Sequence, residues 1–243
     1  MKLYGLIGFP LTHSFSKKYF SDKFEQLGLT GYRYENFPIA SIDLLPQILK
    51  DNPQLAGLNV TIPHKESIVA LLHEQSDAVK KIGACNCIKI QDGRLSGYNT
   101  DVVGFEQTLL TKLKPYHKKA LILGTGGAAK AVEFVLEKLK IEFNYVSRKK
   151  GMDHLTYEQL TTAIVEEYSL IVNTTPVGMY PTINEAPPIP YEALSANHLL
   201  YDLIYNPAKT LFLQKGEEKG AAILNGMEML IIQAEESWKI WNS

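Results

Sequence analysis

The chain has 243 residues, of which 45% are hydrophobic and 21% are charged, and this ordinary globular composition excludes a disordered or collagen-like chain. The 25 Lys and Arg residues nearly balance the 26 Asp and Glu residues, so no overall positive charge favours nucleic acid as a partner. The two cysteines, Cys85 and Cys87, are too few for a disulfide framework and too close together for a usual metal site. We therefore expect a protein of a reducing compartment, the cytoplasm. No run approaches the ~18 apolar residues of a membrane helix, and the apolar start is too short for a signal peptide.

The first part of the chain alternates β-like runs with amphipathic stretches, which indicates an α/β domain with a largely parallel sheet. Strands are expected at residues 3–8, 32–37, 55–60 and 84–90. Helices are expected at residues 16–27, 42–49, 63–72 and 76–82. Asp92 and Gly93 predict a turn.

A strong amphipathic helix is expected to open at Asp101. Its apolar stripe consists of Val102, Phe105, Leu109 and Leu113. Further strands are expected at residues 120–123, 143–147, 170–173, 199–203 and 221–224, and further helices at residues 128–139, 157–166, 207–219 and 227–241. We place the change of domain at Asp101, and expect residues 1–101 with 226–243 to form one domain and residues 102–225 the other.

A glycine-rich turn separates the first strand and helix of the second domain. Gly124 permits a tight turn, and Gly126 and Gly127 let the backbone approach a pyrophosphate that the N–H groups of the helix start would face. Because Gly126 and Gly127 are adjacent, the strict dinucleotide spacing is not met, and Ala129 stands where a third glycine is usual. A glycine turn without a ligand is the alternative.

The residues after the next strand bear on which dinucleotide would bind. An NAD site has a carboxylate there, which accepts a hydrogen bond from the ribose 2′-hydroxyl. This chain has Ser147, Arg148, Lys149 and Lys150 instead. Cationic side chains suit the 2′-phosphate of NADP, and a solvated basic loop is the alternative.

Three short motifs of the first domain carry polar residues that stand out chemically. Ser14 and Ser16 follow the first strand and could donate to a carboxylate, although each also suits the N-cap of the next helix. Lys65 is expected in the first turn of a helix, where the macrodipole should lower its pKa, unless it is an exposed surface lysine. Asp101 stands at the domain junction, where ligands often bind, or it caps the following helix. A lysine and an aspartate that meet there would handle a proton beside a nicotinamide.

Eight short motifs, in order along nearly the whole chain, resemble those of the shikimate dehydrogenase family. They include Asn-Val-Thr-x-Pro-x-Lys ending at Lys65 and Gly-x-Asn-Thr-Asp ending at Asp101. The eight lie at residues 8–16, 59–65, 83–86, 97–101, 124–127, 173–179, 202–207 and 226–233. Each motif is weak alone, whereas all eight in register are highly specific.

The resemblance implies an α/β fold of two domains with a cleft between them. One is an N-terminal α/β substrate domain, the other is a Rossmann-like NADP-binding domain, and the last helix folds back on the first domain. It implies the reversible NADPH-dependent reduction of 3-dehydroshikimate to shikimate, in the pathway to chorismate and the aromatic amino acids. The cofactor is NADP, and no metal is implied.

The same resemblance implies roles for single residues. Lys65 and Asp101 would be the catalytic pair. Substrate binding would fall to Ser14, Ser16, Thr61, Asn86, Tyr205 and Gln233. Cofactor binding would fall to Gly124, Gly126, Gly127, Ala128, Ser147, Arg148, Lys149, Thr174 and Gly226.

Other functions remain open at this point. The same chemistry on quinate or another ring acid is one, and a non-catalytic NADP-binding sensor is another. A different two-domain dehydrogenase, such as one acting on folate, would leave Ser14, Ser16 and Gln233 unexplained. We expect a small-molecule substrate, no nucleic acid or membrane partner, and a monomer or homodimer.

Overall fold

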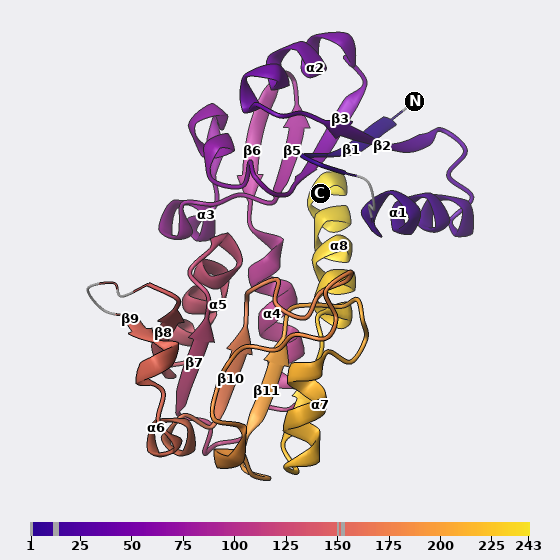
Figure 1. Ribbon diagram of the computed structural model, residues 1–243. Coiled ribbons are helices and arrows are strands. Elements are labelled where there is room, and N and C mark those ends of the chain that lie inside the picture. The colour runs from indigo at the N-terminus through magenta and orange to yellow at the C-terminus, as the bar shows by residue number, and fades with distance from the viewer. Residues whose placement is uncertain (1, 12–14, 150, 152–153) are drawn as a thin grey trace. The chain divides into compact units, whose positions relative to one another are not determined.

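The computed structural model describes residues 2–11, 15–149, 151 and 154–243. The chain divides into two compact units, one formed by Met1–Thr100 with Ala234–Ser243 and the other by Asp101–Gln233. The boundary between Gln233 and Ala234 falls inside one continuous helix, α8 (Met227–Asn242). The first half of α8 belongs to the second unit, and its second half belongs to the first unit. Each unit contains a β-sheet with helices packed on it, so the α/β fold class is confirmed (Figure 1).

In the described part of the first unit, six strands form one sheet in the order β2-β1-β3-β5-β6-β4. The strands are β1 (Lys2–Gly8), β2 (Tyr32–Pro38), β3 (Leu55–Val60), β4 (Glu74–Gln75), β5 (Cys87–Gln91) and β6 (Arg94–Tyr98). The first three strands are mutually parallel, whereas β5 is antiparallel to both β3 and β6. Of the strands described here only β5 is reversed, so the largely parallel sheet that was expected is confirmed. The reversal comes from the turn at Asp92 and Gly93, both with positive φ, which joins β5 and β6 as a hairpin.

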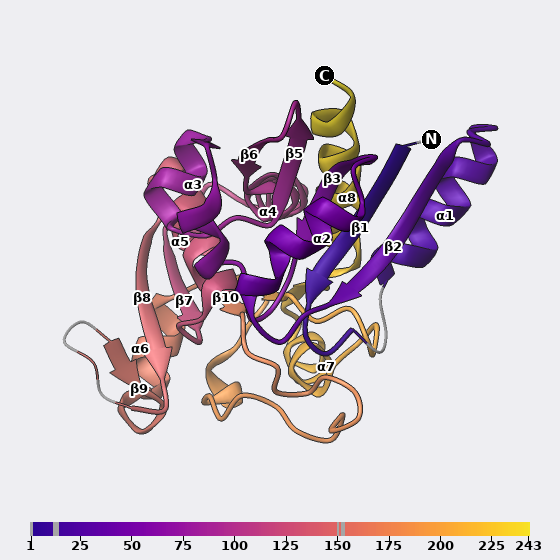
Figure 2. The ribbon, with the colours of Figure 1, turned by 90° about the horizontal axis from the view of Figure 1, so that it is seen from above.

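Helices cover both faces of this first sheet. They are α1 (Phe15–Gln26), α2 (Leu45–Asp51), α3 (Asp77–Ile82) and the second half of α8, with short 3₁₀ turns at Ile42–Leu44 and Ser67–Leu71. Figure 2 shows α2 and α8 on opposite faces. The Trp241 ring of α8 stacks on Tyr4 of β1 at 4.8 Å between centroids, and its indole N–H donates to the Ile88 carbonyl at 3.0 Å. The expectation that the last helix folds back on the first domain is therefore confirmed.

In the described part of the second unit, six parallel strands run in the order β12-β11-β10-β7-β8-β9. They are β7 (Lys119–Leu123), β8 (Glu142–Ser147), β9 (His154–Thr156), β10 (Leu170–Asn173), β11 (Leu199–Asp202) and β12 (Ala222–Leu224). Counted along the chain, this is the 3-2-1-4-5-6 order of a Rossmann fold. The helices of this unit are α4 (Thr100–Leu110), α5 (Gly127–Lys138), α6 (Thr162–Glu167), α7 (Leu211–Glu218) and the first half of α8, with 3₁₀ turns at Tyr157–Gln159 and Tyr191–Ala193.

The helix expected at residues 63–72 is wrong. Only a 3₁₀ turn, Ser67–Leu71, forms there, and Lys65 lies in the turn that precedes it. In an α-helix the Lys65 carbonyl would accept from Val69, but here it accepts from the Cys85 N–H at 2.7 Å, and Val69 bonds to Glu66 instead. The macrodipole argument for Lys65 therefore fails, because no α-helix starts there.

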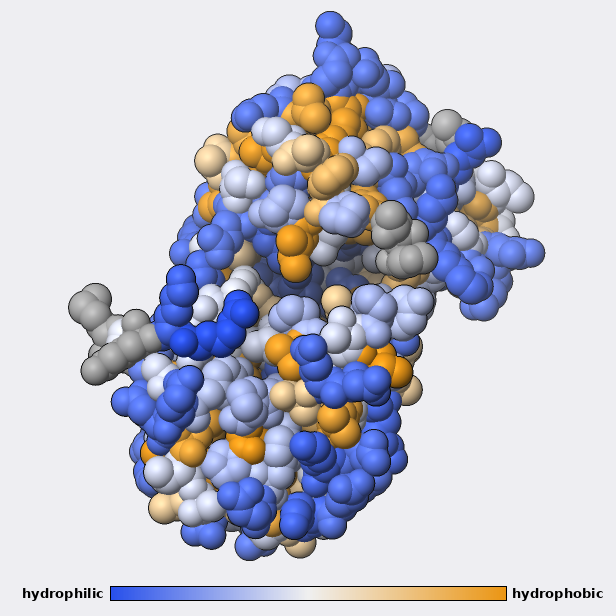
Figure 3. All heavy atoms as spheres, in the orientation of Figure 1, coloured by the Kyte–Doolittle hydropathy of each residue, from blue (hydrophilic) through white to orange (hydrophobic). Residues whose placement is uncertain are grey.

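Hydrophilic residues dominate the face of the molecule seen in Figure 3, and hydrophobic residues are scattered among them. Within the described ranges, no helix combines the length and the apolar character that crossing a bilayer requires.

Candidate active site

One candidate site lies at the carboxyl edge of the parallel strands in the first unit. Two backbone hydrogen bonds join the loops that follow β1 and β3, from Thr61 to the Ile7 carbonyl at 2.9 Å and from Phe9 to the Ile62 carbonyl at 3.0 Å. The chain leaving β1 and the chain leaving β3 are thus held together. Open α/β sheets bind ligands at this edge.

Lys65 and Asn86 lie on neighbouring segments at that edge. The Cys85 N–H donates to the Lys65 carbonyl at 2.7 Å, and the Val60 N–H donates to the Asn86 carbonyl at 2.9 Å. These two bonds hold the Lys65 backbone against Cys85, and the neighbouring Asn86 against the end of β3. Lys65 and Thr61 are half-buried, whereas Asn86 is buried. The structure therefore brings together three of the residues expected to serve catalysis and substrate binding.

The start of α4 is fixed to the same edge by side chains. The Thr100 N–H donates to Asn86 Oδ1 at 2.6 Å, and Asn86 Nδ2 donates to Thr100 Oγ1 at 3.0 Å. One residue earlier, Asn99 Nδ2 donates to the Ala84 carbonyl at 3.0 Å. Asp101 follows directly and is half-buried in the first turn of α4. The backbone that carries Asp101 is thus held in place by buried hydrogen bonds.

Ser16 lies in the first turn of α1 and is half-buried. Burial raises the pKa of Tyr34 well above its usual value, against the opposing effect of a hydrogen bond with the Ser16 side chain. Tyr34 is therefore a neutral hydroxyl that donates to Asn59 Oδ1 at 2.8 Å. Ser14, the other serine expected to bind a carboxylate, lies outside the described residues.

Three buried polar residues of this unit received no role from the sequence. Asn59, Thr100 and Ser237 are 5%, 1% and 0% exposed, and they hydrogen-bond to one another or to Asn86. Asn59 and Thr100 stand inside motifs quoted above, which is a signal that could have singled them out. Ser237 had only a weak signal, its position one helical turn after Gln233 on α8.

Another candidate site lies in the second unit, at the carboxyl ends of β7 and β10, where the strand order reverses. Gly124 follows β7 with φ 104°, and a Cβ there would lie 2.8 Å from Thr174 Oγ1. Thr174 follows β10 and donates to the Leu123 carbonyl through its side chain at 2.7 Å. Only glycine fits this close approach. Dinucleotides bind at such a switch point.

The start of α5 has the features of a pyrophosphate site. Gly126 is the N-cap, Gly127 is the first residue, and the first turn contains no acidic residue. A Cβ added at either glycine would meet no atom within 4 Å, so these positions leave open space beside the helix N-terminus. Ala128 is half-buried and Ala129 is buried against the sheet. The residues present fit the diphosphate of NADP.

The basic loop begins beside this turn. The Gly124 N–H donates to the Val146 carbonyl at 2.9 Å, so the end of β8 lies next to the glycine turn. The Ser147 hydroxyl donates to the Lys149 carbonyl, which curls the loop, and the side chains of Arg148 and Lys149 are exposed. Lys150 lies outside the described residues. Two exposed cations at the end of the second strand fit a 2′-phosphate.

A buried carboxylate supports the loop after β11. Asp202 is fully buried and accepts from Thr210 Oγ1 at 2.6 Å, from Asn173 Nδ2 at 3.0 Å and from the Ile204 N–H at 3.1 Å. Burial raises its pKa to about 6, although these hydrogen bonds oppose the shift. Gly226 packs against the start of the same loop. A Cβ at this position would lie 2.0 Å from the Leu203 carbonyl oxygen, so only glycine fits there.

Tyr205 and Gln233 belong to the second unit, whereas Asn86 belongs to the first. Tyr205 is half-buried in the loop after β11. Gln233 is 8% exposed, and its Nε2 donates to the Leu230 carbonyl of its own helix at 2.9 Å. Their roles toward a substrate stay predictions.

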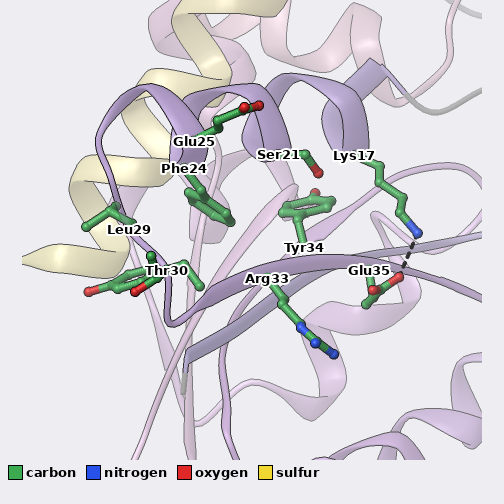
Figure 4. Close-up of a pocket in the computed structure, with 10 residues that line it drawn as sticks. Lys17, Ser21, Phe24, Glu25, Leu29, Thr30, Arg33, Tyr34 and Glu35 are labelled. Carbon is green, nitrogen blue, oxygen red and sulfur yellow. Dashed lines mark hydrogen bonds and ion pairs between the residues drawn. The ribbon is translucent and has the colours of Figure 1, made fainter.

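A separate cavity of about 370 Å³ lies between α1 and β2 (Figure 4). Phe24 and Tyr34 contribute to its lining, and the Lys17 Nζ to Glu35 Oε2 ion pair of 2.7 Å lies at one end of it. Its walls carry both signs of charge, and apart from Tyr34 none of the residues discussed above lines it. It therefore does not belong to the site expected from the sequence.

Comparisons with known proteins agree with this arrangement. A family model described as the shikimate dehydrogenase substrate binding domain matches residues 6–88. The NADP(+) shikimate dehydrogenase of Methanococcus maripaludis strain C7 is 39% identical over 99% of this chain and 91% of its own length. The crystal structure of Thermus thermophilus shikimate 5-dehydrogenase with NADP(H) and shikimate superposes with a TM-score of 0.87, at 31% identity over 99% of this chain and 93% of that chain. A 5-ketofructose reductase of Gluconobacter is also similar, with a TM-score of 0.83 at 27% identity over 99% of this chain and 92% of that chain. The chain belongs to the shikimate dehydrogenase family.

Proposed function

We propose that this chain catalyses the reversible NADPH-dependent reduction of 3-dehydroshikimate to shikimate. The observation that carries the proposal is the pair of backbone hydrogen bonds that holds Lys65 against Cys85 and the neighbouring Asn86 against the end of β3. Relatives named NADP(+) shikimate dehydrogenases match the chain over nearly its whole length, which supports the same activity here.

The side chains of the first unit would bind and protonate the substrate. Ser14 and Ser16 donate hydroxyl hydrogens to the ring carboxylate. Thr61 and Asn86 bind ring hydroxyls, and Gln233 and Tyr205 of the second unit complete the substrate contacts. We infer these roles from the motifs that the residues share with the family.

Lys65 and Asp101 would handle the proton. Lys65 gives a proton to the carbonyl oxygen that becomes the hydroxyl, and its ammonium stabilises the charge that develops there. Asp101 orients Lys65 and accepts a hydrogen bond from a ring hydroxyl. The buried hydrogen bonds of Thr100 support this role, because they hold the start of the helix on which Asp101 stands.

The second unit would hold NADP. Gly124, Gly126, Gly127 and Ala128 face the diphosphate, and Thr174 lies beside them at the switch point. Ser147, Arg148 and Lys149 would bind the adenosine end and its 2′-phosphate, and Gly226 would bind the cofactor as well. When bound, NADPH supplies the hydride for the reduction.

The domain roles follow from these assignments. We propose that residues 1–101 with 226–243 form the substrate domain and that residues 102–225 form the NADP domain. We also propose a cytoplasmic enzyme that acts as a monomer or a homodimer. Light scattering of the purified chain distinguishes the two assembly states.

Reduction of NADP⁺, followed by NADPH absorbance, tests the function with shikimate and quinate in parallel. Turnover of shikimate with the higher kcat/KM supports the proposal. A chain that turns over quinate alone, or that binds NADP without turnover of either acid, would contradict it.

A second candidate activity is the reduction of a keto sugar. The similarity to a 5-ketofructose reductase favours this activity, because that reductase uses the same fold on a substrate without a carboxylate. NADPH oxidation with 5-ketofructose provides the comparison. The Ser16→Ala variant separates the two, because loss of a carboxylate-binding hydroxyl weakens shikimate turnover and leaves keto-sugar turnover unaffected.

A further inference from the structure

We propose that Ser237, on the buried face of α8, is a positioning residue that sets the orientation of Asn86 and of the start of α4 through Thr100. This inference rests on the function proposed above, since Asn86 and Asp101 are the groups that it serves. Ser237 itself lies in none of the motifs shared with the family.

The Ser237 hydroxyl lies at the centre of a buried hydrogen-bond network. It is 0% exposed and accepts from Asn59 Nδ2 at 2.9 Å. Its oxygen lies 3.3 Å from Thr100 Oγ1. Because Ser237 accepts from Asn59, its own hydrogen can donate toward Thr100.

On one side the network reaches the substrate-binding amide. Thr100 Oγ1 accepts from Asn86 Nδ2 at 3.0 Å, and the Thr100 N–H donates to Asn86 Oδ1 at 2.6 Å. An amide that is held at both its nitrogen and its oxygen has one orientation. Asp101 follows Thr100, so a shift of Thr100 would also shift the backbone that carries the carboxylate.

On the other side the network reaches a buried tyrosine of β2. Asn59 Oδ1 accepts from the Tyr34 hydroxyl at 2.8 Å. One chain of buried hydrogen bonds therefore runs from Tyr34 to Asn86. Ser237 is the member of this chain that lies on α8.

Attachment of α8 does not account for this hydroxyl. Ala234 and Trp241 already bury the helix against the sheet, with the Trp241 ring 5.2 Å from Phe20 between centroids. An alanine would pack at position 237 without the oxygen. Polar groups in such an apolar interface restrict the orientation of their partners, because a buried amide left unbonded is costly.

The test compares two variants of the same helix. Ser237→Ala removes the central hydroxyl, whereas Trp241→Phe removes a different buried hydrogen bond, the one to the Ile88 carbonyl. We expect both to lower the thermal midpoint. Only Ser237→Ala should lower kcat/KM for shikimate, by roughly three- to tenfold, with KM for NADP unchanged. Equal losses in the two variants, or a wild-type kcat/KM in Ser237→Ala, would overturn the proposal.

Thr100→Val tests the next link and remains informative if Ser237→Ala does not fold. It keeps the shape and the backbone N–H but removes the hydroxyl, so it should reproduce the selective loss with shikimate. The double variant should be no worse than either single one, because all three break the same chain. Additive losses would show that the two hydroxyls act independently and would overturn the proposal.

Amide hydrogen exchange separates failure of this inference from failure of the proposed function. The Thr100 N–H bonded to Asn86 should exchange roughly tenfold faster in Ser237→Ala than in Trp241→Phe, whatever reaction the chain catalyses. If the wild type does not turn over shikimate but this difference is found, the function is wrong and the positioning role stands. Equal exchange in the two variants overturns the positioning role.

Discussion

The backbone N–H of Thr100 donates to Asn86 Oδ1 at 2.6 Å, although 14 residues separate them. This bond joins the residue before β5 to the first residue of α4, and both groups are buried. It satisfies one of the N–H groups that a helix start leaves without an intrahelical partner. The Asn86 side chain therefore fixes the backbone N–H of Thr100, the residue before Asp101.

Lys65→Ala should lower kcat by ~10²–10⁴, because removal of a general acid–base group has that typical cost. Lys65 lies in a turn whose carbonyl bonds to Cys85, and this backbone bond survives the substitution. Folding and NADP binding should therefore persist. Asp101→Asn should lower kcat in parallel but less, since the orienting charge is lost while its shape remains.

Steady-state kinetics with shikimate and NADP⁺ measures these effects, and NADP titration by fluorescence checks the cofactor site. Lys50→Ala provides the control, because Lys50 is an exposed lysine on α2. A Lys65→Ala variant with near wild-type kcat would remove Lys65 from the mechanism.

Ser16→Ala should raise KM for shikimate more than it lowers kcat. The carboxylate is remote from the reacting carbon, so the enzyme holds it equally in the ground state and the transition state. Ser21→Ala, an exposed serine of the same helix, is the matched control. A kcat loss with unchanged KM would place Ser16 in the chemical step rather than in binding.

Strands with a clear apolar pattern could be predicted from the sequence. The bounds of β3 and β10 match the expected ranges, and α3 begins after Ser76, whose side chain accepts from the Val79 N–H. In these places the local pattern, the capping residue and the tertiary contacts agree.

Elements set by distant partners could not be predicted. The turn at Lys65 exists because Cys85 takes its carbonyl, and α7 begins four residues later than expected because Thr210 caps it. The β9 strand is three residues long and was not expected at all. Such short elements form only when a neighbouring strand supplies their hydrogen bonds.

The residues of the candidate site also divide into those that a local motif predicts and those that only the fold reveals. The glycine turn and Lys65 stand in motifs with local signatures, whereas Ser237 contacts Thr100 across 137 residues of sequence. Nothing in the pattern of α8 distinguishes a serine that orients a distant amide from one that faces solvent. Only the fold reveals that difference.

Asp202 should make the second unit less stable as the pH rises from about 4 to about 6. Its pKa is about 6 in the folded chain and 3.8 as the reference value, so the folded state binds the proton more tightly. Below pH 4 both states are protonated and the penalty is absent, whereas above pH 6 both are ionised and it is fully present. Two pKa units correspond to about 3 kcal/mol of unfolding free energy.

Carboxyl-carbon NMR of the full chain measures this directly, with Asp202→Asn to identify the signal. A midpoint near pH 6 is expected, and the pH dependence of the unfolding midpoint over this range should flatten in Asp202→Asn. Asp77→Asn, at an exposed carboxylate, should keep the wild-type dependence. A resonance already ionised at pH 4 would show that the three hydrogen bonds outweigh burial.

The loop after β8 should give the enzyme a preference for NADP over NAD of roughly ten- to a hundredfold in kcat/KM. A charge-assisted contact to phosphate contributes ~1.5–3 kcal/mol, and Arg148 is exposed at the carboxyl edge of the sheet, where the strand ends next to the glycine turn. Arg148→Ala should reduce the preference by weakening NADP binding, with NAD turnover little changed.

Lys118→Ala is the matched control, because Lys118 precedes β7 at the opposite edge of the same sheet and carries the same charge. The contact is exposed, so added salt should narrow the preference in the wild type and have less effect in Arg148→Ala. Kinetics with both cofactors at low and high salt measures all of these effects. Equal use of NAD and NADP by the wild type at low salt would show that the cations of this loop do not bind the phosphate.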